Sequence, residues 1–121
     1  MNNEVNLSLL NLANSKTKKA SKLFERLVEH IVRFEENLAP ELQVGGRLVS
    51  SGDITFSIED IGFWNPDVII FYGTLPDGSK IELVQHVSQL SVLLVAVPRK
   101  EKVTIPKRKI GFQMDENVVN N

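Results

Sequence analysis

The stretch IELVQHVSQLSVLLVAV, residues 81–97, is the most apolar part of the chain and decides how its second half is organised. Apolar and polar residues alternate over residues 80–83, and an uninterrupted apolar run fills residues 92–97. Both patterns predict strands. The junction between them carries four hydrogen-bonding side chains: Gln85, His86, Ser88 and Gln89. A buried amide or imidazole is costly unless satisfied, so these groups either bond within the chain or face a ligand.

Outward from this stretch, the preceding segments predict three more strands. They are expected at residues 42–49, 54–61 and 68–72, with a hairpin turn at residues 76–79. The third strand is apolar on both faces and is therefore expected at the centre of the sheet. Gly45 and Gly46 indicate a bulge or a close approach, and residues 107–112 predict an additional edge strand.

A single long helix is predicted over residues 15–38. Its apolar residues recur at spacings of three and four: Ala20, Leu23, Phe24, Leu27, Val28, Ile31, Phe34 and Leu38. Pro40 ends the helix, because the residue before proline disfavours helical geometry. One helix followed by antiparallel strands predicts an α+β fold, with the helix packed on a five- or six-stranded meander sheet. The expected core includes Phe24, Ile31, Ile54, Phe56, Ile70 and Leu93.

The length of 121 residues predicts one domain over residues 15–113, with a flexible arm at residues 1–14 and a flexible tail at residues 114–121. The chain has no cysteine, which excludes disulfides and cysteine metal sites and is typical of the cytoplasm. The longest apolar run, residues 92–97, is too short to cross a bilayer. We therefore expect a cytoplasmic protein without a membrane partner.

The charges of the chain are segregated, although the formal net charge is only −1. Residues 16–22 contain four lysines and no acid. Residues 25–82 contain eleven acidic and four basic residues, whereas residues 99–109 contain six basic residues and one acid. These segments are either solvated faces or basic parts that converge on an anion or on another subunit. The low net charge predicts no sequence-specific contact with nucleic acid.

Catalysis by His86 would need a nucleophile and an orienting carboxylate. Ser88 lies two residues away without a nucleophile elbow around it, and Glu82 is a partner only through folding. We therefore expect a structural or ligand-contacting role for His86 and no catalytic residue. Gln85 and Gln89 either contact a ligand or partner subunit, or satisfy backbone groups at the strand junction.

The loop Phe63-Trp64-Asn65-Pro66 places the single tryptophan beside another aromatic ring. Such rings either stack on a ligand, with Asn65 orienting a base, or close the end of a core. Further along the chain, Arg99 and Arg108 suit bidentate contact with phosphate. The sequence has no glycine-rich phosphate loop and no metal-ligand spacing, so we expect neither metal nor cofactor.

Four motifs carry a resemblance to known proteins: RLV (47–49), IGFWNP (61–66), QHVSQL (85–90) and IGF (110–112). Over residues 46–112 the chain resembles a family of small bacterial and prophage-encoded domains of unknown function. Small phage proteins often act by binding, and several unrelated ones sequester cyclic-nucleotide immune signals between subunits of a homo-oligomer. This analogy of context, and not of sequence, favours binding over catalysis.

We therefore expect a small, phage-related, non-enzymatic protein that binds an anionic small molecule, such as a cyclic nucleotide, within a homo-oligomer. The predicted ligand contacts are Phe63, Trp64, Asn65, Gln85, His86, Ser88, Gln89, Arg99 and Arg108. The alternative is a protein–protein interaction module that inhibits or scaffolds a host protein. An enzyme that depends on His86 is the least favoured hypothesis.

Overall fold

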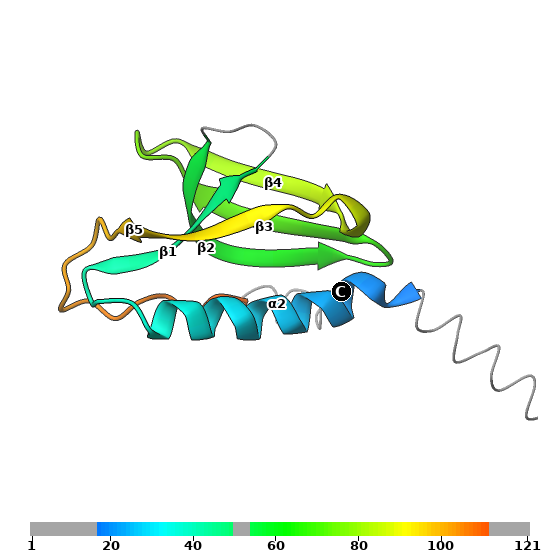
Figure 1. The fold of residues 1–121 in the computed structure, drawn as a ribbon, viewed down its shortest axis with the longest axis horizontal. Coiled ribbons are helices and arrows are strands. Elements are labelled where there is room, and N and C mark those ends of the chain that lie inside the picture. Colours follow the sequence, from blue (N-terminus) through cyan, green and yellow to red (C-terminus); the bar gives the residue numbers. More distant parts are fainter. Residues whose placement is uncertain (1–16, 50–53, 112–121) are drawn as a thin grey trace, which may run out of the picture.

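The computed structural model describes residues 17–49 and 54–111 as one helix and a five-stranded sheet. The elements are α2 (Lys19–Glu36), β1 (Leu42–Leu48), β2 (Thr55–Trp64), β3 (Val68–Thr74), β4 (Lys80–His86), the 3-10 turn η1 (Val87–Gln89) and β5 (Val92–Pro98). The helix lies along one side of the strands (Figure 1). The predicted α+β fold, with an N-terminal helix on an antiparallel meander, is confirmed.

The sheet is strongly curled, as its connections require. The strand order is β4-β3-β2-β1-β5, so consecutive strands pair up to β4, whereas β5 pairs with β1 at the opposite edge. His86 lies across β3 from the end of β2, and Val92 pairs with Leu48 near the start of β2. A flat sheet would separate these points by roughly 30 Å or more, whereas the five connecting residues span at most roughly 20 Å. The strands therefore curl, and β5 crosses in front of them in Figure 1.

The curled sheet and the helix enclose one apolar core. Side chains of directly opposed residues share a face, and the strand register places Phe56, Ile58, Ile61, Ile69 and Phe71 on the same inner face. The helix packs on this face through Phe24, whose ring centroid is 4.9 Å from that of Phe63. Each such buried side chain contributes roughly 1.5–3 kcal/mol to folding.

Two expected core residues are wrong, because Leu93 pairs with Arg47 on the outer face and Ile54 lies before the first residue of β2. Ile54 and Leu93 are 44% and 50% exposed, whereas Phe24, Ile31, Phe56 and Ile70 are buried as expected. No helix within residues 17–49 and 54–111 is long and apolar enough to cross a membrane. The predicted arm at residues 1–14 and the predicted tail at residues 114–121 lie outside the described residues.

The expected bulge lies in β2 and not at the glycines of β1. The register between β2 and β3 shifts between Ile58 and Asp60, so Glu59 is an extra residue on β2. Gly45 and Gly46 instead allow a close approach. A Cβ atom on Gly45 would lie 2.7 Å from a methyl group of Val97.

The bulge opens a gap between β1 and β2, which two charged side chains fill. The pairing of these strands ends at Gly45 and Ser57. Beyond that point, Glu35 of the helix accepts a hydrogen bond of 2.7 Å from the backbone N–H of Val44. Arg108 donates to the backbone carbonyl of Ile58 and forms an ion pair of 3.2 Å with Glu35. The side chains of Glu35 and Arg108 thus take the place of the backbone hydrogen bonds that are missing between β1 and β2.

The same contact explains why the predicted edge strand at residues 107–112 is wrong. Residues 107–111 form no strand, and Phe112 lies outside the described part of the chain. The segment is held by Arg108 and by a 2.5 Å hydrogen bond from the N–H of Gly111 to a carboxylate oxygen of Asp60. Residues 107–111 lie against the gap between β1 and β2. Side-chain hydrogen bonds, and not backbone pairing with a strand, hold them there.

Candidate functional site

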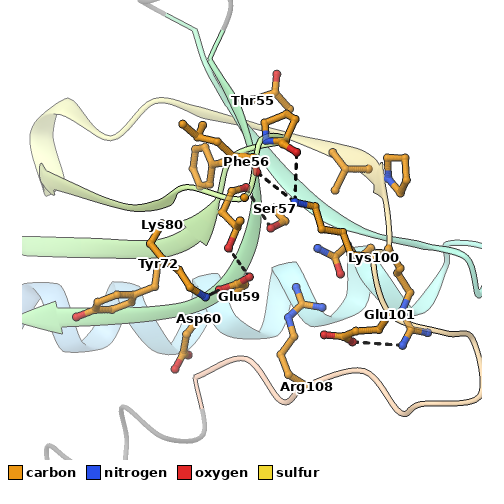
Figure 2. Close-up of a pocket in the computed structure, with 18 of the residues that line it drawn as sticks. Thr55, Phe56, Ser57, Glu59, Asp60, Tyr72, Lys80, Lys100, Glu101 and Arg108 are labelled. Atoms are coloured by element: carbon orange, nitrogen blue, oxygen red, sulfur yellow. Dashed lines mark hydrogen bonds and ion pairs between the residues drawn. The ribbon is translucent and has the colours of Figure 1, made fainter.

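A groove of about 1360 Å³ lies on the outer face of β1, β2 and β3 (Figure 2). Its walls are the turn between β3 and β4 and the segment that follows β5. Six basic residues line it: Arg47, Lys80, Arg99, Lys100, Arg108 and Lys109. Three acidic residues also line it: Glu59, Asp60 and Glu101. The lining therefore has an excess of three positive charges, and we call this hollow the basic groove.

The β2 bulge directs Glu59 into the basic groove. An extra residue in a strand turns its side chain away from the regular alternation, which is how bulges commonly aim side chains into sites. The Glu59 carboxylate accepts a 2.6 Å hydrogen bond from the hydroxyl of Thr74 and lies 3.4 Å from the ammonium group of Lys80. Figure 2 shows the side chains of Glu59 and Lys80 facing one another. This part of the groove is therefore held in place and largely neutralised.

Arg47 and Lys100 contribute charge that these contacts do not neutralise. Arg47 donates through Nε to the hydroxyl of Thr55 at 3.0 Å. Lys100 reaches the turn between β3 and β4, where its ammonium group lies 3.5 Å and 3.3 Å from the carbonyl oxygens of Leu75 and Pro76. Hydroxyl and carbonyl oxygens are neutral acceptors, so both cations retain their attraction for an anion.

Tyr72 adds an aromatic ring to the groove. Burial raises the pKa of its phenol above the ordinary value of 10.0, and the negative charges of Glu82 and Asp60 raise the pKa further. The phenol is therefore neutral at physiological pH and is able to donate a hydrogen bond. A ring beside cations suits a ligand that has both a flat apolar part and negative charge.

The two arginines predicted to contact phosphate also line the groove, but the structure shows them bonded to the protein. The side chain of Arg99 is only 4% exposed. It donates to the carbonyl oxygens of Pro40, Lys102 and Ile105, and so holds the segment after β5 in place. Arg108 forms the contacts with Glu35 and Ile58 described above. These bonds make both residues supports of the groove walls.

The other predicted contacts lie at the opposite end of the sheet. Phe63 packs on Phe24 of the helix, as expected for a residue that closes a core. Asn65 accepts a hydrogen bond of 3.0 Å from the N–H of Ser21, and the carbonyl of Pro66 accepts one of 2.8 Å from Ala20. This loop, with its cis Asn65–Pro66 bond, satisfies free N–H groups at the start of the helix. Trp64 is 59% exposed.

The polar junction between β4 and β5 is bonded mainly within the chain. His86 lies 2.8 Å from the hydroxyl of Ser88 through Nδ1 and 2.9 Å from the carboxylate of Asp67 through Nε2. Gln89 is exposed at the end of η1. Gln85 points to the inner face opposite Ile69, and its side-chain oxygen is buried without a hydrogen-bond partner among the residues the structure describes. The junction thus combines one bonded cluster with one unsatisfied amide.

The comparisons with known proteins identify the family of the chain. A model of a family of unknown function, DUF6173, matches residues 13–113. The chain belongs to this family. The resemblance to a domain family of unknown function is therefore confirmed. No curated protein and no solved structure matches the chain.

Most residues that line the basic groove of this DUF6173 protein were not predicted from the sequence. Tyr72, Lys80 and Arg47 lie on three strands, and only the register places them on one face. A signal was present in part, because Arg47, Thr55 and Ser57 occupy the polar positions of alternating strands. Asp67 was missed as well, since nineteen positions separate it from His86. Among the described residues, no group of three or more acidic or histidine side chains could hold a metal ion.

Proposed function

We propose that the protein binds an anionic small molecule of the nucleotide type in the basic groove. The observation that carries the proposal is the excess of three positive charges around a groove of about 1360 Å³ that also presents an aromatic ring. Ligand sites of drug-sized molecules commonly enclose about 300–1,000 Å³, so the groove is large enough for a nucleotide.

In this proposal, the phosphate lies between Arg47 and Lys100, whose hydrogen bonds go to neutral acceptors. The base or another flat group lies on Tyr72. Arg99 and Arg108 support the walls and add to the positive potential without contacting the phosphate directly. Phe63, Trp64 and Asn65 do not contact the ligand in this proposal, because they lie at the other end of the sheet.

Calorimetric titration with a panel of cyclic nucleotides tests the proposal, with the corresponding neutral nucleosides as the ligand control. Arg47→Gln and Lys100→Gln each remove one charge, and a charge-assisted hydrogen bond contributes about 1.5–3 kcal/mol. Each variant is therefore expected to weaken binding by roughly 10- to 100-fold. Arg26→Gln is the matched control, since Arg26 is exposed on the helix and does not line the groove.

Two results would contradict the proposal. The first is the absence of heat with every nucleotide while circular dichroism shows that the protein is folded. The second is binding that Arg26→Gln weakens as much as the two groove variants do, because the attraction would then depend on total charge and not on the groove.

The second candidate function is a protein-interaction module, which the exposed apolar side chains favour. Trp64 and Val84 are 59% and 51% exposed on the outer face of β2 and β4, on either side of β3. Exposed apolar groups of this size commonly mark interaction surfaces. Light scattering of the wild type and of Trp64→Ser separates self-association from a monomer. A pull-down that recovers one stoichiometric host protein, lost in Trp64→Ser, would favour a heterologous partner.

A further inference from the structure

Asp67, His86 and Ser88 form a chain of hydrogen-bonding side chains at the end of the sheet remote from the basic groove. Asp67 precedes β3, His86 ends β4, and Ser88 lies in η1. Strand pairing of Val68 with His86 and a 2.8 Å bond from the N–H of Val87 to the carbonyl of Asp67 bring the three together. The carboxylate is 2.9 Å from Nε2, and the serine hydroxyl is 2.8 Å from Nδ1.

The bonds around the imidazole determine where its proton lies. The backbone N–H of Ser88 donates to Nδ1 at 3.1 Å, so Nδ1 carries a lone pair in the neutral ring. The proton is therefore on Nε2, where it is donated to Asp67. In this tautomer the basic nitrogen, Nδ1, faces Ser88. The carboxylate of Asp67 lies on the opposite side of the ring, at Nε2. A base that is oriented by a carboxylate and lies within hydrogen-bond distance of a hydroxyl is the arrangement that activates serine nucleophiles.

A capping role accounts for only some of these contacts. Acceptance from the N–H of Ser88 makes His86 the cap of η1. That cap does not require the hydroxyl of Ser88 to lie within 2.8 Å of the same nitrogen. The cluster is also open to a reactant, because the side chains of His86 and Asp67 are 48% and 38% exposed. A purely structural serine would show no enhanced chemical reactivity, so the two roles are experimentally distinct.

The surface beside the cluster is apolar. Trp64 pairs with Val68, which pairs with His86, so the three side chains share the outer face. Val84 lies two residues before His86 on the same face and is 51% exposed. An acyl group with a short hydrocarbon chain would bury apolar area here while its carbonyl carbon lies at Ser88.

We propose that Ser88 is a nucleophile toward activated esters with a small apolar acyl group, that His86 is its general base, and that Asp67 is a positioning residue. In the first step the hydroxyl proton passes to Nδ1, the serine oxygen bonds to the acyl carbon, and the bond to the leaving oxygen breaks. The leaving group takes the proton from Nδ1. Water then attacks the acyl-serine with the same base, which releases the acid and restores the hydroxyl. The activity is independent of ligand binding in the basic groove.

The test is covalent labelling of the full-length protein by a fluorophosphonate, with the modified residue located by peptide mass spectrometry. We expect labelling at Ser88 of the folded protein, and slower labelling of the same residue in urea. General bases accelerate proton transfer by about 100- to 10,000-fold, so His86→Gln is expected to slow labelling by at least about 100-fold. Asp67→Asn is expected to slow it as well, and Asp67→Glu to restore part of the rate.

Ser91→Ala is the matched control, because Ser91 is an exposed serine in the same connection. This variant is expected to be labelled at Ser88 at the wild-type rate, and Ser88→Ala not to be labelled at that position. Circular dichroism establishes that each variant is folded. Absence of a Ser88 adduct in the folded wild type, or an equal rate of adduct formation in the folded and unfolded protein, overturns the proposal. A Ser88 rate that His86→Gln leaves unchanged overturns it equally.

Discussion

Replacement of Glu35 by alanine is expected to destabilise the protein more than any other single change to a charged side chain of the helix. The carboxylate is 10% exposed and makes two contacts that nothing else in its surroundings replaces. It accepts the N–H of Val44 at 2.7 Å and pairs with Arg108 at 3.2 Å. Its removal leaves one buried donor unsatisfied and one guanidinium group without its counter-charge.

The magnitude follows from these two losses. An unsatisfied buried donor costs about 1–3 kcal/mol, and removal of one partner from a buried ion pair costs about 3–5 kcal/mol. The Arg108 side chain is 24% exposed, so water relieves part of the second cost. We therefore expect a loss of about 3 kcal/mol in the free energy of unfolding for Glu35→Ala. Glu35→Gln keeps an acceptor for Val44 and is expected to lose about half as much.

Urea denaturation followed by circular dichroism measures the effect. With a urea dependence of about 1.5 kcal/mol per molar, Glu35→Ala is expected to lower the midpoint by roughly 2 M. Glu36→Ala is the control, because Glu36 is the exposed neighbour on the same helix. A loss of less than about 0.5 kcal/mol for Glu35→Ala, the range of ordinary surface substitutions, would refute the assigned role of Glu35 in closing the gap between β1 and β2.

Three further predictions concern the sheet and the groove. Gly73→Ala is expected to lower the free energy of unfolding by about 3 kcal/mol or to prevent folding, because the added Cβ would collide with a backbone carbonyl of β2. Urea denaturation measures this effect, and a variant as stable as the wild type would contradict the close packing of β2 and β3 at Gly73. Tyr72 is the only tyrosine of the sequence, so absorbance titration reports its pKa directly. This pKa is expected to lie above 10.0, and Glu82→Gln is expected to lower it. An unchanged pKa in Glu82→Gln would contradict the effect assigned to the charge of Glu82. Because the folded pKa of Tyr72 is raised, its contribution to stability is present below the unfolded pKa near 10 and is lost as pH rises through the folded value. The pKa of Asp77 is lowered mainly by the hydrogen bond from the backbone of Ser79, so nuclear magnetic resonance titration should place this pKa below 3.8. The stability linked to the lowered pKa is present above pH 3.8 and is lost as pH falls through the folded pKa.

The helix and the five strands of the core sheet could be predicted from the sequence, because each has either a regular apolar period or a continuous apolar run. Phe24 and Ile31 recur at helical spacing, and Phe56 and Ile58 alternate with polar residues. The curl of the sheet could not be predicted in the same way. It depends on the pairing of β5 with β1, which joins residues far apart in sequence. A period shows that a strand forms but not which strand lies beside it.

The candidate sites were less predictable than the fold, since both depend on contacts between distant residues. Arg108 was predicted as an anion contact from its charge alone, but Glu35 lies seventy-three positions earlier and pairs with it. For His86 the sequence offered only Glu82 as a possible carboxylate partner, whereas the pairing of β3 with β4 brings Asp67 to the ring. The residue types were therefore informative, whereas their partners required the fold.

The β2 bulge connects the stability of the protein with its proposed ligand site. The extra residue directs Glu59 into the basic groove and also separates β2 from β1, so that Arg108 of the C-terminal segment fills the gap. The segment that closes the gap is continuous with the one that carries Lys100 and Arg99 along the groove wall. Loss of the Arg108 contacts would therefore loosen the wall that the ligand needs. Since ligand binding and wall closure favour the same state, an anion in the groove should stabilise the wild type more than it stabilises Glu35→Ala.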